Sequence, residues 1–268
     1  MITMILDNNI DNIKIYDEAG VDRIFLDLEI NGKIQRQGHL DTVISTHEIG
    51  DIYKIKPILK NSELLVRVNP LHSNSSTEIT KSIEYGADII MLPMFKTGQE
   101  VRLFIDYVNK GAKTCLLLET AEALARIEDI LEVDGIDEIH IGLNDLHLSM
   151  GLDFMFELMS DGIAEYLSNK IKEKNIPFGI GGVARMNEGM LPGHVIIKEH
   201  IRLGSQMVIL SRTFKRDIEV DSNIISKEIQ KLKFVENEAK NLTYDKLVEN
   251  KALLKKLVKD IVAVIRNR

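Results

Sequence analysis

The sequence predicts a (β/α)8 barrel, the TIM-barrel fold, with a helical C-terminal extension. Short apolar runs alternate with longer stretches of helical period, which is typical of repeated βα units around a parallel sheet. There are eight such runs, the number that closes a barrel. No Pro/Ser-rich linker divides Met1 from Arg212, so this region is predicted to be one domain. The runs are Thr3 to Leu6, Arg23 to Leu28, Leu64 to Val68, Asp88 to Leu92, Thr114 to Leu118, Glu138 to Leu143, Pro177 to Ile180, and Gln206 to Leu210.

The segments between the runs carry residues that are typical of helix ends. Asn8 or Asn9 can cap the first helix, because their side chains accept hydrogen bonds from backbone N–H groups of the first turn. Ser45 and Glu48 have the spacing of a capping box. Three glycines are predicted to follow the last turns of helices: Gly20, Gly86 and Gly111.

The pattern becomes wholly helical and charged beyond Asp217. We therefore expect a barrel domain over residues 1–218 and a helical extension over residues 219–268. The last segment carries an apolar stripe opposite its lysines, formed by Leu247, Leu254, Leu257, Val258, Ile261 and Ile265. We expect this stripe to pack on the barrel or on a neighbouring subunit, with binding to a membrane surface as the alternative.

The composition excludes several classes of protein. A net charge of −7 argues against a protein that binds nucleic-acid phosphates through a basic face. The single cysteine, Cys115, cannot form a disulfide within the chain, which fits a reducing compartment. The N-terminal segment lacks the pattern of a signal peptide, and no apolar stretch reaches the roughly 20 residues of a membrane span. We therefore expect a cytoplasmic protein without nucleic-acid or membrane partners.

Charged residues close several of the apolar runs, and in a (β/α)8 barrel these positions form the active-site rim. Asp27 and Glu29 end the second run on one face, Arg67 stands in the third, Glu119 ends the fifth, and the sixth leads to Asp145. Arg67 could neutralise one acid as a structural ion pair, but several acids against one arginine leave excess negative charge. A divalent cation removes that excess. We therefore predict that Glu119 and Asp145 bind Mg²⁺, or else Mn²⁺ or Co²⁺.

Four segments resemble the HpcH/HpaI aldolase and citrate lyase β-subunit family of pyruvate-binding barrels. They are "GVDRIFLDLE", "LLVRVNP", "GADIIMLPMFKTGQEV" and "LLLETAEAL…DGIDEIHIGLNDLHLSMG". The resemblance implies that Glu119 and Asp145 bind the metal, that Arg67 contacts the oxo and carboxylate oxygens of a pyruvate-like unit, and that Glu29 acts through metal-bound water. It further implies substrate contacts from Pro93, Gly142, Leu143 and Asn144.

The sequence departs from this family at the position of the catalytic base. In the aldolase branch a histidine follows the glutamate of the second strand, whereas Ile30 stands there in this chain, and Glu84 stands at the place of its acidic partner. The long segment after Glu29 offers His39 and His47 instead, and histidine titrates in the useful pH range. We predict that one of these two histidines takes the proton from the C4 hydroxyl of the substrate.

These features together predict a class II aldolase, a lyase that cleaves or forms a 4-hydroxy-2-oxo acid through a metal-stabilised pyruvate enolate. The predicted partner is a small 2-oxo acid, and the chain is expected to form a homo-oligomer. Two alternatives remain: an acyl-CoA lyase of the citramalyl or malyl type, and a barrel that binds an oxo acid without turnover. The segment "GIGGV" offers either a phosphate cradle or close backbone packing around Gly181 and Gly182.

Overall fold

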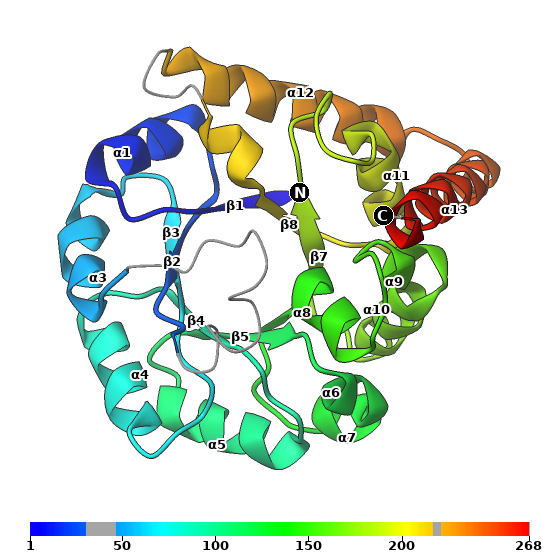
Figure 1. The fold of residues 1–268 in the computed structure, drawn as a ribbon. Helices are drawn as coiled ribbons and strands as arrows, with labels where there is room; N and C mark the ends of the chain where they lie inside the picture. Colours follow the sequence, from blue (N-terminus) through cyan, green and yellow to red (C-terminus); the bar gives the residue numbers. More distant parts are fainter. Residues whose placement is uncertain (31–46, 217–220, 268) are drawn as a thin grey trace.

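The computed structural model describes residues 1–30, 47–216 and 221–267. Eight parallel strands close into a barrel in the order β1 to β8, and helices surround them (Figure 1). The predicted (β/α)8 fold is therefore confirmed. The strands are β1 Ile2–Leu6, β2 Arg23–Asp27, β3 Glu63–Arg67, β4 Ile89–Leu92, β5 Lys113–Leu118, β6 Glu138–Ile141, β7 Phe178–Val183 and β8 Met207–Leu210.

Helices follow the strands and cover the outer face of the barrel (Figure 1). They are α1 Ile10–Ala19, α3 Ile49–Ile55, α4 Ser75–Glu84, α5 Gly98–Val108, α6 Ala121–Ala125, α7 Ile127–Leu131, α8 Leu143–Ser149, α9 Glu157–Ser160, α10 Ile163–Glu173, α11 Gly193–Leu203, α12 Asn223–Lys240 and α13 Tyr244–Arg266. Two short 3₁₀ helices, η1 and η2, span Lys56–Ile58 and Arg212–Lys215.

Side chains alternate between the inside of the barrel and its helix-covered outer face, as the two-residue period of a strand requires. The inward-facing residues form a separate apolar core that includes Met4, Phe25, Leu65, Met91, Cys115, Leu117 and Met207. At the N-terminal ends of the strands, Arg23 Nη1 and Nη2 donate to the two oxygens of Glu138 at 2.7 and 3.0 Å. This buried pair closes one end of the barrel, so the opposite end is the one open to a substrate.

Three of the predicted helix ends are confirmed. Asn9 caps α1 by accepting from the N–H groups of Asp11 and Asn12. Gly20 and Gly86 follow α1 and α4 with φ angles of 84° and 106°, in the left-handed region that glycine adopts without strain.

The other two expectations for helix ends are wrong. Asn109 and Lys110, not Gly111, adopt the left-handed conformation after α5, with φ angles of 45° and 60°. Helix α3 begins at Ile49, so Glu48 is its N-cap, and the backbone N–H of Glu48 donates to Asp51 at 3.0 Å. The capping box therefore starts at Glu48 rather than at Ser45, which lies outside the described residues.

The two C-terminal helices occupy different positions. Helix α12 contacts α1 and α11, so it completes the ring of helices around the barrel, whereas α13 lies outside the ring against α9 and α11 (Figure 1). On α13, Leu247, Leu254 and Val258 are buried, so its apolar stripe is covered by this chain. The domain boundary at residue 218 stays a prediction.

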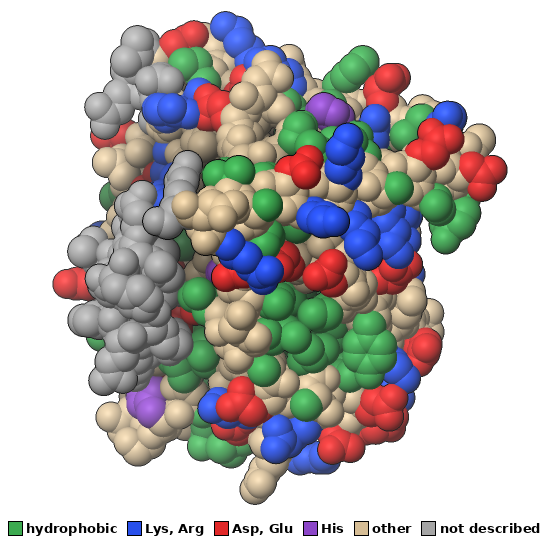
Figure 2. Space-filling view, turned by 45° about the vertical axis from the view of Figure 1, so that its right-hand side comes forward, with side chains coloured by type: hydrophobic (Ala, Val, Ile, Leu, Met, Phe, Trp, Pro, Cys, Tyr) green, Lys and Arg blue, Asp and Glu red, His purple; other side chains and the backbone are tan. Residues whose placement is uncertain are grey.

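The surface carries charges of both signs. On the face shown in Figure 2, basic and acidic side chains alternate around a green apolar area, without a broad region of one sign among the described residues. Among the described helices, none combines the length and the hydrophobicity that a membrane crossing requires.

Candidate active site

An arginine–aspartate fork lies at the open end of the barrel. Asp27 ends β2 and Arg67 ends β3, and the parallel register places these two residues side by side. Arg67 donates from Nε and Nη2 to the two carboxylate oxygens of Asp27, each at 2.8 Å. The guanidinium carbon stands 5.6 Å from the centre of the Phe25 ring. Such a bidentate, stacked pair fixes both the position and the plane of the arginine.

Glu29 approaches the same arginine from another side. Its carboxylate oxygen Oε2 lies 3.3 Å from Nη1 of Arg67, and its backbone N–H donates to Asp27 Oδ1 at 3.2 Å. Burial alone would lower the pKa of Arg67, but the charges of Asp27, Glu29 and Glu119 raise the pKa above its ordinary value. Arg67 is therefore a permanent cation among several acids.

Glu119 is a buried acid of the site. It directly follows β5, is only 3% exposed, and accepts a hydrogen bond from the backbone N–H of Met94 at 3.1 Å. Burial raises the pKa of its carboxyl group; Arg67 opposes this, but Asp145 and Glu29 raise the pKa further. The pKa of Glu119 consequently lies well above its usual range.

Gly142 allows Glu119 to lie in this position. A Cβ atom at residue 142 would stand 3.1 Å from Oε2 and 3.0 Å from Cβ of Glu119, closer than side chains normally pack. Glycine is the residue that leaves room for the carboxylate at this point.

Asp145 reaches the site from a helix. Strand β6 ends at Ile141 and α8 begins at Leu143, so Asp145 belongs to the first turn of α8. The expectation that the sixth apolar run extends to Leu143 is therefore wrong. The half-buried Asp145 is nonetheless close enough to Glu119 to raise the pKa of that residue.

The donor set at Glu119 and Asp145 fits a divalent cation. Within the described ranges, no group of three or more His, Cys, Asp or Glu side chains is arranged to hold a metal by itself. Mg²⁺ does not need such a cage, because it is usually bound by one or two carboxylates together with water and substrate oxygens. The two carboxylates of Glu119 and Asp145 provide this donor set.

His47 is held by the backbone of β2. Its Nδ1 accepts a hydrogen bond from the N–H of Asp27 at 3.0 Å, so the ring hydrogen of the neutral form lies on Nε2. Burial lowers the pKa of His47. In this arrangement His47 can donate a hydrogen bond but has no lone pair ready for a substrate proton. His39 lies outside the described residues.

Glu84 is not brought to this rim. It is the last residue of α4, and a helix that follows a strand runs back along the barrel, so Glu84 lies at the closed end and is exposed. Ile30 is 56% exposed, and its N–H donates to Asn69 Oδ1 at 3.0 Å. Of the predicted substrate contacts, Pro93 is buried directly after β4, and Asn144 is half-buried in the first turn of α8.

The glycines of β7 serve close packing. Gly181 has a φ of 42°, and a Cβ atom there would stand 2.6 Å from Cδ1 of Leu143. A Cβ atom at Gly182 would stand 3.1 Å from the carbonyl oxygen of Ile209. Protein atoms therefore fill the space above these glycines, which favours packing over a phosphate cradle.

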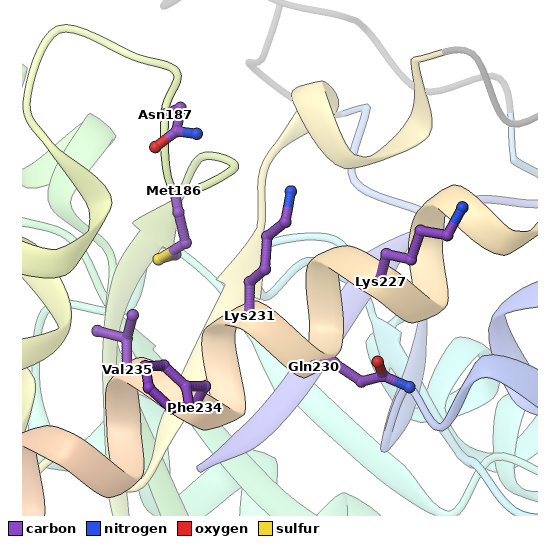
Figure 3. Close-up of a pocket in the computed structure, with 7 residues that line it drawn as sticks. All are labelled: Met186, Asn187, Lys227, Gln230, Lys231, Phe234 and Val235. Carbon is purple, nitrogen blue, oxygen red and sulfur yellow. The ribbon is translucent and has the colours of Figure 1, made fainter.

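Cavities lie at the surface of the described part, and two of them are compared with the site. One of about 210 Å³ lies beside Asp145, between the segments after β4 and β5 and helix α8. Another of about 600 Å³ lies away from the acids: Met186 and Asn187 face Lys227, Lys231 and Phe234 of α12 across it (Figure 3). The smaller cavity is the one that adjoins a predicted metal ligand.

Comparisons with known proteins identify the family of the chain. The model of the HpcH/HpaI aldolase/citrate lyase family matches residues 5–156. A 4-hydroxy-2-oxo-heptane-1,7-dioate aldolase from Klebsiella pneumoniae is 24% identical over 163 residues, which are 50% of this chain and 56% of that protein. A hydroxypyruvate/pyruvate aldolase from Sagittula stellata is 29% identical over 142 residues, covering 40% of this chain and 54% of the relative. The chain thus spans about half the length of these relatives.

A solved structure shows the same fold. The HpcH/HpaI aldolase from Desulfitobacterium hafniense superposes with a TM-score of 0.62, covering 87% of this chain and 92% of the other. The sequence identity is 16%, so this similarity concerns the fold alone.

Proposed function

Because the chain belongs to the HpcH/HpaI aldolase/citrate lyase family, we propose that it is a divalent-metal-dependent carbon–carbon lyase that cleaves or forms a 4-hydroxy-2-oxo acid. The observation that carries this proposal is that the buried Glu119 lies close to Asp145, Glu29 and Arg67 at the open rim, where burial, Asp145 and Glu29 raise its pKa despite Arg67. Similarity to aldolases named for hydroxypyruvate and pyruvate supports a small oxo acid as the substrate.

Glu119 and Asp145 would hold the cation, with Mg²⁺ as the first candidate and Mn²⁺ or Co²⁺ as the others. When bound, the cation would supply Lewis-acid stabilisation of the negative charge that develops on the oxo oxygen. The hydrogen bond from the Met94 N–H to Oε1 of Glu119 holds the carboxylate in one orientation. Asp145 comes from a separate helix, so both ligands rest on rigid elements of the barrel.

Arg67 would bind the oxo acid from one side of its guanidinium group. Its Nε and Nη2 atoms are engaged by Asp27, so Nη1, which faces Glu29, is the group that would donate to the oxygens of the substrate. A charge-assisted hydrogen bond to an oxygen that gains negative charge stabilises the transition state more than the ground state. Asp27 is then a positioning residue, because it fixes Arg67 without touching the substrate.

The proton of the C4 hydroxyl needs an acceptor when the C3–C4 bond breaks. The aldehyde leaves with its new C=O bond, the electron pair of the broken bond stays on the three-carbon fragment, and a proton added at C3 gives pyruvate. Glu29 is 2% exposed and lies next to Arg67, so its carboxylate is our candidate for the acceptor among the described residues. A positioned base of this kind typically contributes about 10²–10⁴-fold to the rate.

Retro-aldol cleavage tests this proposal. The protein is incubated with 4-hydroxy-2-oxo acids, and pyruvate release is followed by a coupled reduction to lactate, with Mg²⁺, Mn²⁺ or Co²⁺ and with a chelator. We expect metal-dependent release that Glu119→Gln abolishes and that Glu128→Gln, which removes an exposed carboxylate on α7, retains. Release of pyruvate at full rate in the chelator, or cleavage of acyl-CoA substrates alone, would contradict the proposal.

A further inference from the structure

The cavity of about 210 Å³ is lined in part by Asp145, one of the two predicted metal ligands. Its walls come from three segments of the open rim: Met94 and Lys96 after β4, Thr120 and Glu122 after β5, and Leu148 together with Asp145 on α8. A substrate bound between Glu119 and Asp145 would therefore have this space beside it.

Met94 contacts Glu119, a predicted metal ligand, and also lines the cavity. Its φ of 55° is uncommon for a residue other than glycine, and its backbone N–H donates to Glu119 at 3.1 Å while the residue also lines the cavity. Strained backbone of this kind persists where the surrounding structure requires it, often at functional sites. The backbone of Met94 thus orients a predicted metal ligand, and its side chain shapes the adjoining space.

The polar groups in the walls already have partners. The Thr120 hydroxyl donates to the Phe95 carbonyl at 2.8 Å and accepts from the Ala123 N–H at 3.1 Å. The Lys96 ammonium lies 2.7 Å from Glu122. Met94 and Leu148 add apolar surface. An anionic group that entered this cavity would find no cation among the described lining residues except Lys96, which Glu122 already pairs.

We propose that this cavity takes the substituent on C4 of the 4-hydroxy-2-oxo acid, which is the side chain of the aldehyde in the reverse reaction, and selects a short, uncharged one. The inference rests on the function proposed above. The volume of about 210 Å³ is enough for a chain of a few carbon atoms. Met94 and Leu148 set the length that fits.

Condensation of pyruvate with a series of aldehydes tests this inference. The ratio of kcat/KM between a long and a short straight-chain aldehyde is measured, together with the ratio between an uncharged aldehyde and one of equal length that ends in a carboxylate. We expect the wild type to favour the short, uncharged aldehydes. Leu148→Ala and Met94→Gly should each shift the length ratio about tenfold towards the long aldehyde, because methylene groups are discriminated by roughly this factor.

The variants are chosen to separate cavity size from damage to the metal site. Glycine adopts the φ of Met94 without strain and keeps the N–H that Glu119 accepts, and Leu148→Ala leaves that hydrogen bond untouched. Leu148→Arg should turn the preference towards the carboxylate-bearing aldehyde. Leu103→Ala, on the exposed side of α5, removes the same side chain elsewhere and should leave both ratios unchanged.

Failure of the inference can be told apart from failure of the proposed function. Absence of metal-dependent proton exchange of pyruvate in the wild type would overturn the proposed function and this inference with it. If exchange is present and the two ratios are the same in wild type, Leu148→Ala and Met94→Gly, the inference alone is wrong. Circular dichroism checks that each variant folds. If Leu148→Ala does not fold, Leu148→Val takes its place.

Discussion

The acids at the open rim differ in how the protein stabilises their charge. Asp27 has the fork of Arg67, at 2.8 Å to each oxygen, so its charge is balanced. Glu119 has one backbone hydrogen bond, while Asp145 and Glu29 repel its charge, and its pKa is raised by burial first and by these acids next. A carboxylate that is buried close to other acids binds either a proton or a cation.

Metal binding is therefore expected to require both carboxylates. Glu119→Gln and Asp145→Asn should each strongly weaken Mn²⁺ binding measured by calorimetry, because each removes one of the two anionic ligands. In the wild type the affinity should fall as the pH falls, since protons compete for Glu119. Asp51→Asn, which alters an acid outside the site, is a suitable control. An affinity equal to wild type in both site variants would show that the cation binds elsewhere.

Substrate affinity is expected to depend on the arginine fork. Arg67→Lys should weaken the binding of oxalate, a stable analogue of the oxo acid, by about 1.5–3 kcal/mol, the range for a hydrogen bond to a charged group. Asp27→Asn should weaken oxalate binding in the same direction, because the plane of Arg67 is no longer fixed. Competition calorimetry gives both values. Wild-type affinity in Arg67→Lys would indicate that Arg67 only neutralises Asp27.

At the level of single elements, the sequence predicted strands better than it predicted their ends. The apolar run of β6 continues through Leu143, yet this residue begins α8 because Gly142 turns the chain, and Gly142 carries no side chain that could mark an N-cap. The left-handed residues after α5 are Asn109 and Lys110, and a lysine in this conformation has no sequence signal. Helix boundaries of this kind depend on tertiary contacts that periodicity does not contain.

The three helices α10, α11 and α13 meet at one carboxylate, Glu165. It accepts from Arg202 at 2.7 Å and from Lys251 at 2.5 Å, and these hydrogen bonds lower its pKa from 4.5 to about 2. Because the pKa is lower in the folded state, this contribution to stability is complete above pH 4.5 and is lost as the pH falls towards 2.

Glu165→Gln should lower the free energy of unfolding by about 0.5–1 kcal/mol at pH 7, the range for a partly exposed ion pair, and by less at pH 3. Urea denaturation at the two pH values measures the difference. Glu84→Gln, which removes an exposed carboxylate at the end of α4, serves as the reference. An equal effect of Glu165→Gln at both pH values would mean that the ion pairs do not stabilise the docking of α13.

The whole barrel could be predicted from the sequence because its signal repeats eight times, and the two-residue period placed the acids of β2 and β5 at the open rim. The same argument placed Arg67 at this rim, near Asp27 and Glu29. An ion pair of Arg67 with one acid was considered from the sequence, but the acid was not identified as Asp27, although the parallel register of β2 and β3 places the two residues side by side. The role of the Met94 backbone could not have been foreseen, since nothing in the sequence marks a methionine with a φ of 55°.

Two buried histidines make the stability of the whole fold sensitive to mild acid. Burial lowers the pKa of His140 to about 4 and that of His200 to about 3. Between pH 6.5 and about 4 the unfolded chain binds more protons than the folded one, so the free energy of unfolding falls as the pH falls, by up to about 1.4 kcal/mol per pH unit for each histidine. Urea denaturation from pH 7 to 5 should show this slope, and His200→Asn should reduce it. A flat profile in that window would contradict the assignment of neutral, buried histidines.

Proton exchange at the methyl group of pyruvate tests the central claim most directly, because it reports enolate chemistry without requiring the true aldehyde. Pyruvate in D₂O is followed by proton NMR with Mg²⁺, Mn²⁺ or Co²⁺ and with a chelator. The wild type should exchange the methyl protons only when a divalent cation is present, and Glu119→Gln should not exchange them under any condition. Exchange that persists in the chelator or in Glu119→Gln, or the absence of exchange with all three cations, would contradict the account.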